Sequence, residues 1–135
     1  MAFNVEKGWG SEWIFADNEE YCGKLLIFSK AGNMCSFHFH MRKRETWFCS
    51  KGSFILRWID TQNGDIHEKL FTEGEDWENG RGIPHQLVAL EDNSIVFEVS
   101  TPDDERDSLR ISPGNSQLIK KEEVENDETN SIDGE

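Results

Sequence analysis

The sequence predicts an all-β fold, an antiparallel barrel of the jelly-roll type. Its apolar runs are short and rich in β-branched and aromatic residues, and none has the period of a long amphipathic helix. Clusters of Gly, Asn and Asp separate these runs at short intervals. Many short strands at such spacing are typical of a closed or double-sheet antiparallel structure.

Eight segments are expected to be strands. In chain order they are residues 13–15, 24–29, 35–40, 45–50, 54–60, 66–71, 86–90 and 94–100. Turn residues lie between them, and Asn63-Gly64 within TQNGD is a strong hairpin signal. Small-molecule sites in such barrels lie at the mouth, where loops join the strand ends.

The length of 135 residues allows one domain with a real core, to which five Trp and nine Phe would contribute. We assign residues 1–115 to this barrel domain. Residues 116–135 hold seven acidic side chains against two lysines and few apolar ones. Such a segment buries too little surface to order itself, so a disordered acidic tail is expected there.

The net charge disfavours some classes of binding partner, and the cysteine content indicates the cellular compartment. The formal charge of −13 disfavours nucleic acids and anionic membranes as partners. No apolar stretch approaches the ~20 residues of a membrane-spanning helix. The three cysteines cannot all pair with one another and form no CxxC motif. A reduced cytoplasmic protein is therefore expected.

Two histidines one residue apart form the most informative motif. Side chains at i and i+2 of a strand share a face, so His38 and His40 project together. Residues 41–44 can turn the chain back, which returns Glu45 to the same place, and His85 follows a turn-like GRGIP. Three imidazoles and one carboxylate suit a divalent metal such as Zn, Fe, Mn or Ni. His67 lacks such context and is expected to be a solvated surface residue.

The same alternation turns Phe37 and Phe39 to the opposite face, where they need cover. Either a second copy of the chain or an N-terminal strand could supply it, and a homodimer is expected on the first reading. If Glu45 faces inward, Trp47 and Cys49 face inward with it.

The chain resembles the cupin superfamily in two motifs. The first, G-x5-H-x-H-x3,4-E-x6-G, is matched at every named position from Gly32 to Gly52. The second is matched in part, at Gly74, Gly82 and His85, with Gly80 and Ala89 at its proline and asparagine. This resemblance covers about residues 8–115. It implies a double-stranded β-helix in which His38, His40, Glu45 and His85 bind the metal.

A narrower resemblance is to the cupin domain of type II mannose-6-phosphate isomerases. It rests on five segments: KGWG at 7–10, HFHMRKRETW at 38–47, IPHQL at 83–87, EVS at 98–100 and ERDSLR at 105–110. It implies an isomerase in which a divalent metal polarises the carbonyl of a sugar phosphate. The expected substrate-binding residues are Arg42, Lys43, Trp47, Arg57 and Arg81, with Arg110 as a further candidate.

Two other functions stay open at the level of sequence. The same ligand set suits an iron-dependent cupin dioxygenase, whose apolar pocket Trp47, Trp58 and Phe97 would line. It also suits a non-catalytic module that binds a sugar or another small ligand. The sequence names no general base for any of these reactions.

Overall fold

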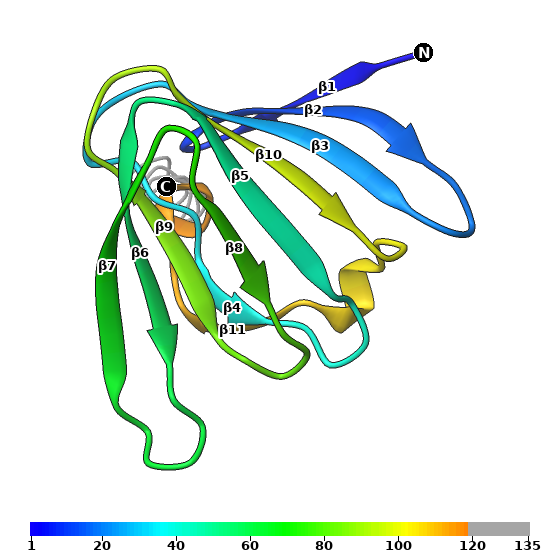
Figure 1. Cartoon of the computed structure of the whole chain (residues 1–135). Coiled ribbons are helices and arrows are strands. Elements are labelled where there is room, and N and C mark those ends of the chain that lie inside the picture. The colour runs from blue at the N-terminus through cyan, green and yellow to red at the C-terminus, as the bar shows by residue number, and fades with distance from the viewer. Residues whose placement is uncertain (119–135) are drawn as a thin grey trace, which may run out of the picture.

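The computed structural model describes residues 1–118 as two antiparallel sheets that pack face to face (Figure 1). The six-stranded sheet has the order β1 (Phe3–Lys7), β2 (Gly10–Asp17), β3 (Cys22–Phe28), β10 (Ser94–Ser100), β5 (Glu45–Lys51) and β8 (Asp76–Asn79). The five-stranded sheet has the order β11 (Leu109–Ser112), β4 (Phe37–Phe39), β9 (His85–Ala89), β6 (Ser53–Ile59) and β7 (Ile66–Thr72). The predicted all-β jelly roll is confirmed.

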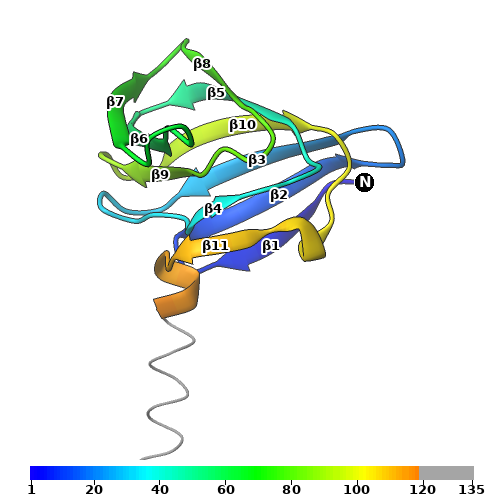
Figure 2. The same ribbon diagram turned by 90° about the horizontal axis from the view of Figure 1, so that it is seen from below.

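Short helical pieces complete the described chain. The 3-10 helix η1 (Glu105–Asp107) precedes β11, and residues 115–118 form a helical turn beyond that strand (Figure 2). Residues 119–135, most of the expected acidic tail, lie outside the described part of the chain. No helix among residues 1–118 is long and apolar enough to cross a membrane.

Aromatic rings from both sheets meet in the core. Phe28 of β3 lies edge-on to Phe54 of β6 at 5.1 Å between ring centroids, and Trp9 stacks on Phe28 at 4.4 Å. Phe28, Phe54, Leu56 and Leu87 are fully buried. Burial of each such side chain stabilises the fold by roughly 1.5–3 kcal/mol relative to an exposed position. This cluster therefore contributes much of the free energy that holds the two sheets together.

Three described strands were not expected from the sequence. They are β1, β8 and β11, each of which lies at the edge of a sheet. Edge strands are solvated along one side, so they need no strict apolar alternation. The expected strand at 35–40 shortens to Phe37–Phe39, which leaves His40 just beyond its end.

The hairpin expected at Asn63-Gly64 joins β6 to β7, with Ile59 opposite Ile66. Gly64 has a φ of 78°, which a glycine adopts without strain, and its amide donates to the Asp60 carbonyl at 2.7 Å. The strongest local turn signal in the chain is therefore confirmed.

Phe37 is buried within the single chain, at 3% exposure. The Arg57 guanidinium lies over its ring, 5.2 Å from the centroid. The N-terminal strand β1 pairs with β2 in the other sheet. Phe37 therefore needs neither of the two covers expected from the sequence, while Phe39 is half-buried.

Candidate metal centre

Three strands of the two sheets bring the four expected ligands together at one end of the barrel. His38 lies in β4 directly opposite His85, the first residue of β9. His40 follows β4, and Glu45 is the first residue of β5 in the other sheet. One ligand atom from each of these four residues lies within 4.8 Å of the others.

Backbone carbonyls fix the orientation of all three imidazole rings. Nδ1 of His38 lies 2.7 Å from the Ser36 carbonyl, Nδ1 of His40 lies 3.0 Å from that of Asp107, and Nδ1 of His85 lies 2.9 Å from that of Ile83. A carbonyl only accepts, so each Nδ1 carries the proton and each Nε2 keeps a free lone pair. Metal-binding histidines are held in this way.

The buried Nε2 of His85 tests whether these residues fit a metal ion. It has no hydrogen-bond partner among the described residues. It lies 2.8 Å from Oε1 of Glu45, but without the alignment of a hydrogen bond. Buried polar atoms are normally satisfied. A cation between Nε2 and the carboxylate would satisfy both, so these residues fit a divalent metal.

The protonation states also fit a metal. Burial lowers the pKa of His38 to about 3, and burial lowers the pKa of His40 as well. Burial opposes ionisation of Glu45, but His85 and Lys43 outweigh it and hold the Glu45 pKa well below its usual range. His38 and His40 are therefore neutral and Glu45 is ionised, which are the forms of these groups that bind metal.

Asp107 organises the loop that joins His40 to Glu45, a role that the sequence did not reveal. Its buried carboxylate accepts from the backbone amides of Met41, Arg42 and Lys43 at 2.8–3.2 Å. Its carbonyl is the one that holds His40. Asp107 lies in the segment ERDSLR that carried the family resemblance, which was the one available signal.

Lys43 lies behind the ligands, although we expected it to contact substrate. Its Nζ lies 3.3 Å from Oε2 of Glu45, 3.2 Å from Glu98 and 3.0 Å from Asp103, and the residue is 5% exposed. Trp47 donates from Nε1 to Glu98 at 3.0 Å. Burial, together with Glu45, raises the pKa of Glu98 to about 7. This ion cluster supports Glu45 from the barrel interior.

Asn79 and Trp77 support Glu45 from the adjoining strand. Asn79, which is buried in β8 opposite Glu45, donates to Oε1 of Glu45 at 3.1 Å. Trp77 in turn donates to Asn79 at 3.0 Å. The Trp77 ring contacts Trp58 at 4.6 Å, and Trp58 is the direct cross-strand neighbour of His85. An aromatic pair therefore flanks the cluster.

The expected substrate-binding arginines separate into two groups. Arg42 and Arg81 are exposed beside the cluster, and Nε of Arg81 donates to the Arg42 carbonyl at 2.8 Å. Arg57 lies elsewhere: it pairs with Gln86 and stacks on Phe37 at the outer face of the five-stranded sheet. Phe97, expected to line a pocket, is instead 40% exposed on the outer face of the six-stranded sheet.

The turn before His85 depends on Gly82. Its φ of 75° lies in the left-handed region, and its amide donates to the His40 carbonyl. This contact ties the loop that carries Arg81 to the end of β4. His67, expected to be solvated, is exposed, but its ring stacks on Trp58 at 5.4 Å.

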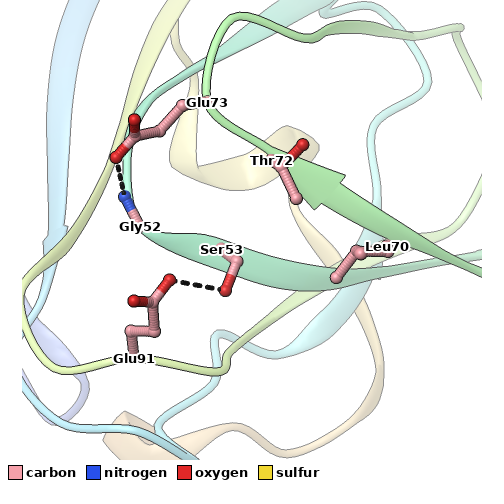
Figure 3. A pocket seen from close by; sticks show the side chains of 6 residues that line it. All are labelled: Gly52, Ser53, Leu70, Thr72, Glu73 and Glu91. Atoms are coloured by element: carbon pink, nitrogen blue, oxygen red, sulfur yellow. Dashed lines mark hydrogen bonds between the residues drawn. The ribbon is translucent and has the colours of Figure 1, made fainter.

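A hollow lies at the other end of β5 from Glu45 (Figure 3). It is lined by Gly52, Ser53, Leu70, Thr72, Glu73 and Glu91. Glu73 accepts from the Gly52 amide at 3.0 Å and Glu91 from the Ser53 hydroxyl at 2.8 Å. Both acids are already engaged by the turn between β5 and β6, so this hollow does not compete with the histidine cluster as the candidate site.

Comparison with known proteins rests on three-dimensional structure. No family model matches the sequence, and no curated protein matches it. The capsular polysaccharide assembling protein CapF from Staphylococcus aureus matches with a TM-score of 0.71 and 18% identity, over 83% of this chain and 33% of that chain. Oxalate decarboxylase from Bacillus subtilis matches with a TM-score of 0.70 and 22% identity, over 82% of this chain and 30% of that chain.

KdgF from Halomonas sp. is similar over nearly its whole length. The match has a TM-score of 0.63 and 21% identity, over 78% of this chain and 91% of that chain. This chain spans about a third of the length of CapF and of oxalate decarboxylase. Another structure of the decarboxylase concerns its Mn(II) centres.

At these identities, the likeness shows the fold alone. The neighbours are cupin-fold proteins, and this chain shares their double-sheet barrel. The chain therefore has the cupin fold, and His38, His40, Glu45 and His85 form within it a cluster that could hold a metal ion.

Proposed function

We propose that the chain is a metal-dependent isomerase of a phosphorylated sugar. The observation that carries the metal site is the convergence of three oriented Nε2 atoms and the Glu45 carboxylate within 4.8 Å. A divalent metal bound there supplies a Lewis acid that polarises a carbonyl oxygen. Zn, Fe, Mn and Ni all suit such ligands. The resemblance of residues 38–47 to the isomerase motif supports a sugar phosphate as substrate.

The exposed arginines around the histidine cluster would bind the phosphate group of the substrate. Arg42 and Arg81 expose their guanidinium groups beside the cluster. Arg110 is the direct neighbour of His38 across β11 and β4, and it is also exposed. Guanidinium groups bind phosphate through paired hydrogen bonds. They place positive charge around the site in a chain whose net charge is −13.

The interior residues keep the site in one geometry. Lys43 is held by three carboxylates and Asn79 by Glu45, so neither is free to move into the site. Their role in the proposal is to orient Glu45 and to balance its charge. The three cysteines are unpaired, which supports a reducing compartment, and we place the protein in the cytoplasm.

The second candidate is an iron-dependent dioxygenase, which the Trp58–Trp77 pair beside His85 favours. These rings could pack against an apolar or aromatic substrate. A ligand-binding module without catalysis would use the same groups. The three functions differ in bound metal, oxygen consumption and turnover.

The test combines metal analysis with NMR detection of aldose–ketose conversion for a panel of sugar phosphates. Turnover should require metal and should vanish in His85→Ala. Arg81→Ala should raise KM for the phosphorylated substrate about tenfold and leave kcat nearly unchanged, because it removes one charged hydrogen bond. Arg44→Ala, whose guanidinium pairs with Glu78, is the matched control.

Two results would contradict the isomerase. One is substrate-dependent oxygen uptake by iron-loaded protein, which would establish the dioxygenase. The other is saturable sugar-phosphate binding with no conversion under any metal, which would leave a binding module.

A further inference from the structure

Large apolar side chains cover the outer face of the six-stranded sheet. Trp13, Phe15, Phe48, Phe97 and Val99 are 40–57% exposed there. Such residues usually lie in a core, and their exposure together on one face marks an interaction surface.

Strand register makes this surface continuous. Trp13 lies opposite Leu25, Leu25 opposite Phe97, and Phe97 opposite Phe48, so one row crosses β2, β3, β10 and β5. The Phe15 ring lies edge-on to Phe97 at 6.3 Å. We call Trp13, Phe15, Leu25, Phe48, Phe97 and Val99 the aromatic face.

The aromatic face has the size of an interface core. A fully buried aromatic side chain removes about 150–250 Å² from water, so the four exposed rings leave roughly 350 Å² uncovered. Val99 and the half-buried Leu25 bring the exposed apolar area to roughly 500 Å², near the upper end for a monomer. A stable interface needs about 800 Å² on each partner, polar rim included.

The uncharged aromatic face allows a second copy of this acidic chain to dock, because the like charges of the two copies can stay outside the contact. The chain carries −13 overall, yet no residue of the aromatic face is ionisable. The acids Asp76 and Glu78 of β8 lie at one edge of the face. An anionic membrane would be repelled by this chain. Two copies can place their uncharged rows together and keep their acids at the rim.

The geometry of the sheet also suits a copy of itself. Two sheets pack face to face readily when their strands are nearly aligned, and a two-fold interface needs only one self-complementary patch. We propose that the aromatic face is the two-fold interface of a homodimer. Glu45 and Glu98 project from the opposite side of the same sheet. The candidate metal site of each copy therefore stays open in the dimer.

The other sheet offers a weaker surface for comparison. Ile66 and Leu70 are exposed on the outer face of β7, but Glu68 lies between them and pairs with Arg57. Burying this surface would also bury ions. Leu70, exposed by 54%, is therefore a matched control for the aromatic face.

The test is sedimentation equilibrium of the full chain over a concentration series. The wild-type chain should have the mass of a dimer at about 1 µM, a typical affinity for a stable interface of this size. Phe97→Glu should raise the dissociation constant at least about 100-fold, since each copy places a negative charge at the centre of the shared interface. Leu70→Glu should leave it unchanged.

Circular dichroism and metal binding show whether Phe97→Glu is folded, and Phe48→Ser supplies a milder second variant that should also weaken the dimer. A monomeric wild-type chain at high concentration would overturn the proposal and assign the face to a different protein. Dissociation by Leu70→Glu, with Phe97→Glu and Phe48→Ser still dimeric, would overturn it too. Because none of these variants lies among the ligands, the result is independent of whether the proposed isomerase activity exists.

Discussion

The two faces of the six-stranded sheet differ in what they bury. Near the candidate metal ligands, its inner face holds Glu45, Glu98 and Lys24, which are 2–7% exposed. Its outer face exposes Phe48 and Phe97 on the same two strands, β5 and β10. A sheet that only needed stability would bury its apolar face and solvate its charged one.

The buried ions of β3, β5 and β10 are confined to the end of the inner face that carries Glu45. Placing ions inside a barrel is costly unless they are paired, and each ion in the cluster has at least one partner of opposite charge. The cluster ends at Glu45, a candidate metal ligand. Exposed rings that lie together on one face mark an interaction surface, whereas scattered ones do not. In our proposals, the inner face carries the metal site and the outer face carries the dimer interface.

The largest effect is expected from removal of the buried cation. Lys43→Met leaves Glu45, Glu98 and Asp103 without their shared partner, so the free energy of unfolding should fall by about 3 kcal/mol. Urea unfolding of the metal-free protein measures it. Arg42→Met, which changes the exposed neighbour, should stay within about 0.5 kcal/mol. Equal effects of the two variants would show that the ion cluster is not a structural element.

A pair of neighbours on β5 tests the two faces directly. Trp47 is 2% exposed and donates a hydrogen bond to Glu98, whereas Phe48 is 45% exposed. Trp47→Phe should lower stability by about 2 kcal/mol, through the lost volume and an unpaired carboxylate oxygen. Phe48→Ala should change the stability of the monomer by less than about 1 kcal/mol while weakening association. The reverse order in denaturant titrations would contradict the assignment of faces.

The smallest expected effect is in the acid limb of stability. Burial tends to raise the pKa of Asp103, but Lys43 and Lys24 outweigh it and lower this pKa to about 2. The unfolded chain therefore takes up the proton first, and stability is lost as pH falls from about 4 to about 2. Because the side chain is 35% exposed, the loss is screened to about 1 kcal/mol.

Asp103→Asn should flatten this limb and cost a similar amount at neutral pH. Asp65→Asn, in the exposed loop between β6 and β7, controls for the loss of one charge. Acid titration of unfolding by fluorescence measures both. An unchanged acid limb in Asp103→Asn would remove Asp103 from the stabilising ion cluster.

The metal ligands were predictable because they follow local rules. The period of a strand places His38 and His40 on one face, and the short loop before Glu45 returns it to them. His85 was found through the turn-like GRGIP that precedes it, and the partial match to the second cupin motif supported it. Asp107 and Asn79 were not found, because they act across long sequence separations through backbone amides and strand register.

The basic loop shows why exposure is hard to read from sequence. Arg42, Lys43 and Arg44 form one polar run, which suggests either a solvated turn or a substrate clamp. Asp107 binds the loop amides so that Lys43 points into the barrel and the two arginines point outward. Only the contact between Asp107 and the loop amides shows which of these three basic side chains is buried. The edge strands β1 and β8 were not predicted for a related reason. Their mostly polar residues give no apolar pattern long enough to predict a strand.

The central claim is that His38, His40, Glu45 and His85 hold a divalent metal. The direct measurement is metal content by elemental analysis, after dialysis, of the wild-type chain, of Glu45→Gln/His85→Ala, and of His67→Ala as a control histidine outside the cluster. The account predicts one metal per chain in the wild type and in His67→Ala, and almost none in the double variant. Stoichiometric metal retained by the double variant would contradict it.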